Sequence, residues 1–474
     1  MKIIFFILGL ACTGIIAFSN VVADGLTGLF LLPLSFSIAV VICNNAIGYA
    51  KDSFGLLILY SLILLRYLVS PVLIALSGTL VPNVSTSAMG LQFAIFIMIV
   101  ELFVVVTAIN STWKPVSTMT LRKSGAEFRF TLFGAIACLF LVAVLLYRGT
   151  LQNVMDHLTF GNNYIYADES ELKTYDMSTF LLLKSFLFIA IVAWVFKKYK
   201  KTHCRIDKVI LMIAAILAAV GNSMIYQASN RATMVMGTLA SVSVLSYCFG
   251  KNFIRFIPII IVTLSVFVWG LFANGTLGVK AGESLLDKDD YISEISRVAE
   301  LYSNGVSIEA HAFDMFDVIT MRMSIATHIS ELVNSNNIFT LPGLWLVKKA
   351  VDTTPSTQRL FNETLDEGSA FILPNSGLAM YCGGKYLGLL FDIIFHWLMV
   401  SGIYFFYKNR NESCDLSIIY LYSYIEMILG FMLMNNVFIA LSLLSAVPFL
   451  LYMLIRLNKL GAGVQLDMTH QLRS

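Results

Sequence analysis

Charge is scarce in this sequence, and its scarcity excludes a soluble protein. Of the 474 residues, 58% are hydrophobic and only 13% are charged, with a mean hydropathy of +0.80. A soluble chain this apolar would have too few polar side chains to cover its surface, so the sequence predicts an integral membrane protein. The net charge of +3 is too small to indicate a nucleic-acid partner, and we expect none.

Cysteine is nearly missing from the one long polar stretch, residues 274–385. Only Cys382 of the seven cysteines falls within it, which excludes an internal disulfide, so the stretch must be held by its own packing. No group of His, Cys and Asp residues shows the spacing of a metal site along the sequence. We therefore expect a metal-independent protein without a cofactor.

Internal repeats, inverted pairs of broken helices and low-complexity linkers are also missing. Several connections between apolar segments are very short, such as residues 227–231 and 250–252. Short connections force neighbouring helices to be antiparallel. The expected fold is an all-α membrane protein, a polytopic bundle of about twelve transmembrane helices with one large, partly helical extracytoplasmic loop.

Twelve apolar segments are long enough to cross a hydrocarbon core of about 30 Å. A signal-peptide cleavage site can be drawn after the first of them, but we expect that segment to be retained, because polytopic proteins rarely need cleavage. The predicted spans are Ile3–Ser19, Leu26–Ala46, Phe54–Leu76, Met89–Ile109, Phe130–Tyr147, Thr179–Phe196, Val209–Tyr226, Ala232–Phe249, Phe253–Phe272, Tyr386–Tyr407, Ser417–Leu433 and Phe438–Ile455.

Lysine and arginine collect in the connections on one side of this bundle, whereas the short connections on the other side hold only Arg148, Lys173 and Arg231. Positively charged connections stay in the cytoplasm, so both termini are predicted to be cytoplasmic and the large loop extracytoplasmic. The basic residues on the cytoplasmic side are Lys51, Lys114, Arg122, Lys123, Arg129, Lys197, Lys198, Lys200, Lys201, Arg205, Lys208, Lys251, Arg255, Lys408, Arg410, Arg456 and Lys459.

The chain is thereby divided into spans one to nine (1–273), the large loop (274–385), spans ten to twelve (386–455) and a cytoplasmic tail (456–474). The loop carries fourteen carboxylates, eight basic residues and two histidines. Helical periodicity predicts helices over Asp289–Tyr302 and His311–Val333, the second an amphipathic helix lying on the membrane or the bundle. Turn residues after position 341 predict an irregular second half, where binding residues tend to lie.

A few charges lie within predicted spans, where each costs at least about 2.5–3.5 kcal/mol and requires a partner or a function. Arg66 and Glu101 lie at similar depth on consecutive spans, and we expect an ion pair that fixes helix registry in preference to a site. Asp392 and His396 are four residues apart on one helix face. Either the Asp392 carboxylate orients the His396 imidazole below the loop, or the two residues are a polar pair facing the bundle interior. Glu426 has no evident partner in the sequence.

Arg231 is the basic residue best placed to bind an anion. It follows a short connection, in the sequence Ser229-Asn230-Arg231, and opens the eighth predicted span on the extracytoplasmic side. A planar guanidinium suits bidentate phosphate binding, and a helix N-terminus presents free backbone N–H groups to an anion. Snorkelling toward lipid headgroups is the alternative interpretation of this position.

Three short segments stand out beside this topology: the turn Ser229–Thr233, the segment Leu341–Lys349, and Gly368–Gly388 with its small residues before a helix. Together with about twelve spans and one large late loop, they resemble the Wzy-type polymerases of oligosaccharide repeat units, which are related in fold to the O-antigen ligases. The sequence departs from the family pattern at Gly383, where the family has an aromatic residue. It also departs at Ala379, where the family often has an acid.

The resemblance implies a glycosyltransferase of the bacterial plasma membrane that uses polyprenyl-diphosphate-linked oligosaccharides. The growing chain on undecaprenyl diphosphate would be moved onto a fresh lipid-linked repeat unit, with membrane lipid around the site and a chain-length regulator protein as the expected partner. Such a reaction needs cationic groups for the departing diphosphate and a base for the acceptor hydroxyl.

The candidate residues for this chemistry are the following. The catalytic candidates are Arg231, Arg322 and His328, and the substrate-binding candidates are Arg297, Arg359, Lys348, Glu363 and Glu367. Residue spacing does not single out the base from His311, His328, Glu363 and Glu367. Three other functions stay open: a lipid-linked oligosaccharide flippase, an O-antigen ligase, and a non-enzymatic receptor or anchor. A flippase should show charges along several spans and two pseudo-symmetric halves.

Overall fold

The computed structural model describes most of the chain and is built of helices. It describes residues 2–19, 26–42, 53–78, 80, 84, 86–114, 131–147, 174–224, 231–250, 291–336, 338, 345–351, 356–365, 371–445 and 447–471. Helices make up 88% of this part of the chain, which contains no β-strand. The predicted all-α class is therefore confirmed for the described residues.

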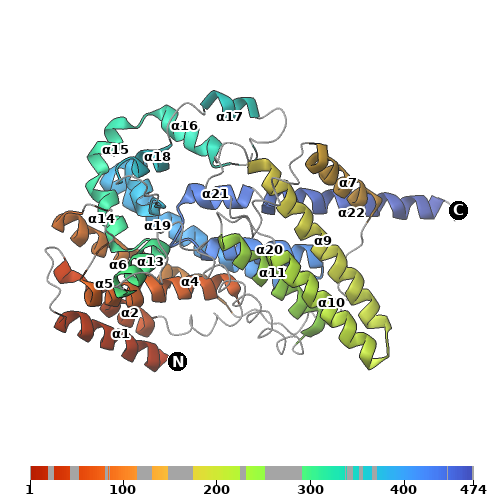
Figure 1. The fold of residues 1–474 in the computed structure, drawn as a ribbon, viewed down its shortest axis with the longest axis horizontal. Coiled ribbons are helices and arrows are strands. Elements are labelled where there is room, and N and C mark those ends of the chain that lie inside the picture. The colour runs from red at the N-terminus through yellow and green to blue at the C-terminus, as the bar shows by residue number, and fades with distance from the viewer. Residues whose placement is uncertain are drawn as a thin grey trace. The chain divides into compact units, whose positions relative to one another are not determined.

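The helices follow one another along the chain as Figure 1 shows. The first half contains α1 (Lys2–Phe18), η1 (Leu26–Gly28), α2 (Leu31–Ile42), α4 (Phe54–Leu64), η2 (Leu65–Val69), α5 (Ser70–Ser77), α6 (Ala88–Thr112), α7 (Leu132–Tyr147), α9 (Thr174–Lys201), α10 (Arg205–Met224) and α11 (Arg231–Phe249). The second half contains α13 (Tyr291–Ser303), α14 (Val306–Asp314), α15 (Phe316–Arg322), α16 (Ile325–Asn334), α17 (Trp345–Val351), α18 (Thr357–Asn362), α19 (Asn375–Glu412), α20 (Leu416–Gly430), α21 (Val437–Ser445) and α22 (Val447–Gln471).

Five helical segments are long and apolar enough to cross a membrane: Phe54–Ser77, Ala88–Thr112, Arg205–Ser223, Asn375–Glu412 and Val437–Leu460. Shorter apolar helices and α9 lie within other predicted spans. The ninth predicted span, residues 253–272, lies outside the described part of the chain. Helices able to cross a membrane are thus present, which is consistent with a helical membrane protein, and the total of about twelve remains a prediction.

The chain forms two compact units. The first, which we call the acidic unit, contains residues 1–115, 285–405 and 426–442, and the second, the distal unit, contains residues 116–284, 406–425 and 443–474. In the distal unit the buried Asn222 amide donates to Ser241 and to the Tyr420 hydroxyl, and Lys184 Nζ donates to the Asn222 carbonyl at 2.7 Å. The candidate sites that the structure describes with their side chains all lie in the acidic unit.

The third predicted span is not a uniform α-helix. Between α4 and α5, η2 is a π-helical turn of five residues, and Pro71 follows it at the start of α5. Proline has no N–H to donate and disturbs a regular helix, and π-helical turns occur often at functional sites. The turn places Arg66 and Tyr67 in the interior, where both side chains are buried.

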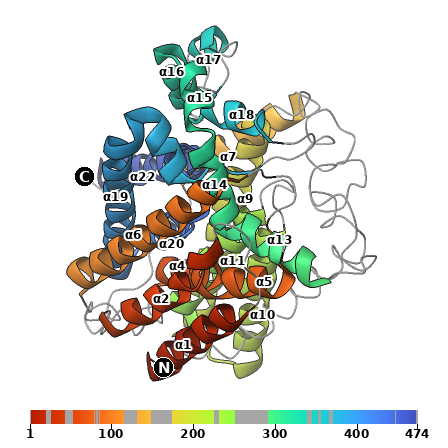
Figure 2. The same cartoon turned by 90° about the vertical axis from the view of Figure 1, so that its left-hand side faces the viewer.

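The first half of the polar segment packs against the spans. Helix α13 lies along α5, and α14 lies along α6 (Figure 2). The predicted helix Asp289–Tyr302 corresponds closely to α13. The predicted helix His311–Val333 is wrong as a single element, because the chain forms α14, α15 and α16 instead. Ser324 adopts an extended conformation and caps α16 together with Thr327, which ends the helix before it.

Helix α14 is an interior helix and not an amphipathic cover. All residues from 306 to 313 are buried, including Glu309 and His311. Its apolar residues join a core that also contains the second half of the polar segment, and Tyr381 of α19 donates to the Ala312 carbonyl at 2.6 Å. This core consists of Val84, Ile308, Ala312, Ile319, Leu360, Phe361, Leu365, Phe371, Leu373, Leu378 and Tyr381. All described cysteines are free, so packing holds the segment as predicted.

The tenth predicted span forms the second part of a longer, broken helix. Helix α19 starts at Asn375, inside the predicted loop, and is broken at Gly384, whose φ is 76°, so the part after the break agrees with the predicted start. Residues with a Cβ rarely adopt this left-handed conformation, so glycine suits the break. The break falls next to the predicted boundary at residue 385, and the turn before it places Asn375 and Ser376 beside the bundle interior.

The acidic unit contains a close helix crossing that alanine should disrupt. A Cβ on Gly55 would lie 2.3 Å from the Glu426 carbonyl oxygen, and one on Gly430 would lie 2.5 Å from the Gly55 carbonyl oxygen. Gly55→Ala should therefore lower the free energy of unfolding by about 1–3 kcal/mol, measured by thermal unfolding in detergent. Gly14→Ala is the matched control, since nothing lies within 4 Å of its Cβ position. An equal effect of the two substitutions would contradict this packing.

Candidate functional site

Arg66 lies at the centre of a buried group of charges. Its Nη2 atom is 2.7 Å from Glu309 Oε1 and 3.0 Å from Glu101 Oε2, and its Nη1 atom donates to the Leu433 carbonyl at 3.3 Å. The three charged side chains are each 2% exposed. The predicted ion pair of Arg66 with Glu101 is thus confirmed, and Glu309 of α14 adds a second carboxylate that spacing did not reveal.

Asp392 and His396 form a second buried pair on α19. His396 Nδ1 lies 3.3 Å from Asp392 Oδ1 and 2.9 Å from the Asp392 carbonyl oxygen. Asn375 Nδ2 donates to Asp392 Oδ1 at 2.7 Å. Both side chains are almost fully buried, which agrees with the polar pair facing the interior.

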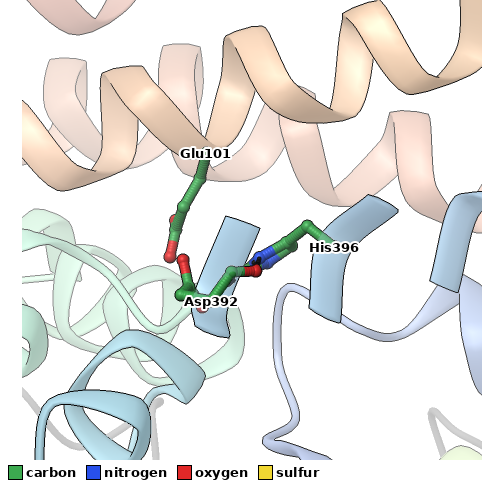
Figure 3. A group of neighbouring side chains, drawn as sticks. All are labelled: Glu101, Asp392 and His396. Atoms are coloured by element: carbon green, nitrogen blue, oxygen red, sulfur yellow. Dashed lines mark hydrogen bonds and ion pairs between the residues drawn. The ribbon is translucent and has the colours of Figure 1, made fainter. Parts of the chain in front are cut away.

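The two groups meet in the interior (Figure 3). Ligand atoms of Glu101, Asp392 and His396 all lie within 4.8 Å of one another, and the carboxylates of Glu101 and Asp392 point toward each other. These residues come from α6 and α19, almost three hundred positions apart in the sequence. The lack of metal-ligand spacing in the sequence therefore did not exclude such a group. The only indication of this group in the sequence was that it contains charged residues within predicted spans, where such residues are rare.

The polar segment adds another buried carboxylate, Glu300 of α13. It accepts hydrogen bonds from the Ser70 hydroxyl and the Ser307 N–H, both at 3.3 Å. Burial outweighs these bonds and raises the pKa of Glu300 to about 7. Burial also raises the pKa of Glu309, although Arg66 and the Ser376 hydroxyl, which donates to Glu309, counter part of the effect.

Glu426 finds its partner in this unit as well. The Ser53 hydroxyl donates to Glu426 Oε1 at 2.5 Å, and the Gly55 N–H donates to the same atom at 3.2 Å. Ser53 is also the N-cap of α4. The carboxylate therefore serves the start of a helix and lies apart from the charges around Arg66.

The chemistry of the buried group favours a cation. Glu101 and Glu309 already neutralise Arg66. Asp392 and His396 lie beside Glu101, in an interior where unpaired charge is costly. A diphosphate would meet mainly negative charge here. The buried group therefore does not suit an anion such as the predicted diphosphate.

The polar segment brings three of the predicted residues together at its surface. Arg322 Nη2 lies 2.6 Å from Glu363 Oε2, and Arg359 Nε lies 3.2 Å from Glu363 Oε1. Hydrogen bonding from Arg322 is the main reason that the pKa of Glu363 is lowered, with Arg359 adding to it. All three side chains are exposed, so the cluster, which we call the arginine cluster, is open to a ligand.

His311 and His328 differ in how exposed their side chains are. His311 is buried, with Nε2 3.0 Å from the Thr364 hydroxyl and its ring edge against Phe361, so it is wrongly placed for a base that meets a substrate. His328 of α16 is half-buried, and its Nδ1 lies 3.6 Å from the exposed Cys382 sulfur. His328 is the better placed of the two.

The other predicted residues are scattered. Arg297 lies half-buried on α13, and Lys348 lies half-buried on the short helix α17. Arg231 begins α11 in the distal unit, which agrees with the predicted helix start, but its side chain lies outside the described part. Glu367 lies outside the described residues. Only Arg322, Arg359 and Glu363 are therefore brought together by this structure.

An exposed apolar surface adjoins the arginine cluster. Met321 and Ile325, on either side of Arg322 in the sequence, are 84% and 79% exposed. Further exposed apolar residues lie on α15 and on the contacting helices α16 and α17, and we call the whole set the apolar surface: Val318, Met321, Ile325, Ile329, Leu332, Leu346 and Val347. Apolar surface of this kind beside charged groups is typical of contact with lipid.

Comparison of the chain with protein-family models, curated proteins and solved structures finds no match. Its function must therefore be argued from its own residues.

Removing the guanidinium of Arg66 should destabilise the protein strongly. Arg66→Met leaves Glu101 and Glu309 buried without their cation, which should cost about 3–5 kcal/mol in thermal unfolding. In a double-mutant cycle, Glu309→Gln should restore part of this loss in the Arg66→Met background. Additive effects of the two substitutions would contradict direct coupling of the pair.

Glu300 should make stability depend on pH. Its folded pKa of about 7 lies above the usual value of 4.5, so the folded state binds the extra proton and loses stability as pH rises from about 5 to 8. Glu300→Gln should flatten this decline, by on the order of 3 kcal/mol between the two ends. The exposed Glu412→Gln is the control, and parallel pH profiles of wild type and Glu300→Gln would refute the assignment.

Proposed function

We propose that the protein is a membrane glycosyltransferase that polymerises polyprenyl-diphosphate-linked oligosaccharide repeat units. The observation that carries this proposal is the arginine cluster beside an exposed apolar surface. A polyprenyl diphosphate has the same two parts, an anionic headgroup and a long hydrocarbon chain. The resemblance to Wzy-type polymerases points to the same ligand class.

The arginine cluster suits the diphosphate. Both guanidiniums bind the carboxylate of Glu363, which is itself an anionic group. A diphosphate has more charge and more oxygen atoms than one carboxylate, so it can displace Glu363 and engage both arginines in charge-assisted hydrogen bonds. Contacts that strengthen as charge develops on the leaving group would accelerate the reaction.

The proposed step is a substitution at the anomeric carbon of the growing chain. The hydroxyl oxygen of the acceptor repeat unit attacks this carbon, and the bond from the carbon to the diphosphate oxygen breaks with its electron pair leaving on the diphosphate. His328 takes the hydroxyl proton as general base. Lys348, Arg297 and Glu367 are assigned to substrate binding. The site would face the extracytoplasmic side of a bacterial plasma membrane, with a chain-length regulator as partner.

A lipid-linked oligosaccharide transporter is the second candidate. The buried charges of Arg66, Glu101, Asp392 and His396 all lie on span-forming helices, and concentrated charge within spans is a feature expected of transport proteins. An assay of surface polysaccharide length in a deletion strain separates the two functions, because a transporter is needed for single repeat units to reach the surface at all.

The double variant Arg322→Ala/Arg359→Ala should leave surface polysaccharide as single repeat units, with the protein still in the membrane. Loss of the two cations should lower the transfer rate by about 100-fold or more, read as collapse of the ladder on a gel after complementation of a deletion strain. Lys408→Ala, an exposed cation paired with Glu412, is the control and should give a normal ladder.

A normal ladder in the double variant would refute the role of the arginine cluster. Absence of all surface repeat units in the deletion strain, single units included, would instead favour the transporter or a ligase.

Arg231 is tested in the same assay. Arg231→Ala should give single units, and Arg231→Lys should recover part of the ladder, because lysine keeps the charge but not the planar fork. Full-length ladders with Arg231→Ala would refute a role of Arg231 in polymerisation.

A further inference from the structure

The buried group around Arg66 contains more negative than positive charge. Three carboxylates, those of Glu101, Glu309 and Asp392, lie around one guanidinium. A histidine that ligates a metal is neutral, so with ionised carboxylates the group would offer an ion two negative charges in a site that is almost closed to water. Uncompensated charge in such an environment is costly, so the group requires protons or a positive ligand.

Two carboxylate oxygens in this group accept no hydrogen bond from the described residues. Asp392 Oδ1 accepts from Asn375, but no donor among the described residues reaches Asp392 Oδ2, although the side chain is 1% exposed. Glu101 Oε2 likewise accepts no hydrogen bond within the described part and has only its ion pair with Arg66. Figure 3 shows the two carboxylates directed toward one another. A buried carboxylate oxygen directed at another carboxylate calls for a cation between them.

We propose that Glu101, Asp392 and His396 bind a divalent metal ion of the Mn²⁺ or Zn²⁺ type. Their ligand atoms lie within 4.8 Å of one another, close enough to converge on one ion. Two carboxylate oxygens and one imidazole nitrogen form a mixed set that suits Mn²⁺ and Zn²⁺, whereas Mg²⁺ and Ca²⁺ prefer oxygen alone. The two charges of the ion balance the two excess negative charges. Three protein ligands also leave part of the coordination sphere open.

Neighbouring residues already orient these ligands. Asn375 donates to Asp392 at 2.7 Å, and Arg66 binds Glu101 while its second carboxylate partner, Glu309, comes from the polar segment. Groups behind the ligands commonly fix their direction and strengthen metal binding. Because Glu309 belongs to α14, the site would also tie the polar segment to the spans. This site is separate from the arginine cluster and goes beyond the proposed function.

The test uses the full-length protein in detergent, purified without a histidine tag and washed with chelator. Addition of Mn²⁺ or Zn²⁺ alone should raise the unfolding midpoint by at least about 2 °C, and about one ion per chain should remain after desalting, measured by mass spectrometry. Equal amounts of Mg²⁺ should produce no shift. With Mn²⁺ bound, pulsed electron paramagnetic resonance should detect coupling to one imidazole nitrogen.

Asp392→Asn, Glu101→Gln and His396→Gln should each lower metal retention at least tenfold, and His396→Gln should remove the nitrogen coupling. Glu426→Gln is the matched control, a buried carboxylate of the same unit whose retention of metal should equal that of wild type. Variants that fail to fold do not weaken the test, because the wild-type titration stands alone.

The site would be refuted if the wild-type protein retained no metal and its stability changed with pH but not with added metal. Protons would then neutralise the group. Equal retention in Asp392→Asn and Glu426→Gln would refute it as well. These measurements need no polysaccharide substrate. A metal-free protein with a normal ladder, or a metal-binding protein without polymerase activity, would therefore distinguish this inference from the proposed function.

Discussion

The acidic unit depends on the interactions of the buried Arg66 guanidinium. The guanidinium binds Glu101 of one span-forming helix, Glu309 of the polar segment and the carbonyl of Leu433. A buried cation is tolerated only while these partners stay in place, so it sets the register between the helices that carry them. Arg66 lies in the π-helical turn Leu65–Val69, together with the buried Tyr67 and Leu68.

The polar segment is built around this anchor. Its first helices lie against α5 and α6, and its second half closes an apolar core around Ile308 and Phe361 without a disulfide. Acids that face inward, such as Glu300, meet hydroxyl and backbone donors, whereas Glu363 faces outward and meets arginines. The segment therefore presents two environments of opposite preference, an interior that favours cations and a surface that favours anions.

This separation decides where each chemistry can take place. The proposed diphosphate site needs exposed cations beside apolar surface, and the arginine cluster near Met321 and Ile325 has both. The buried group cannot replace it, because Glu101 and Glu309 already neutralise Arg66. The two proposals, substrate binding at the surface and cation binding in the interior, are thus independent of each other.

The sequence by itself determined the membrane class, most helix positions and the pairs that are close along the chain or on consecutive spans. Asp392 with His396 follows from helical spacing, and Arg66 with Glu101 from the cost of charge within spans. Only the tertiary structure joined Glu309 to Arg66 and brought Asp392 to Glu101. The physical reason is that contacts between distant segments depend on the rotation and register of packed helices, which hydropathy does not encode. A local cap such as Ser324 likewise outweighs helical periodicity where its hydrogen bonds replace those of the helix.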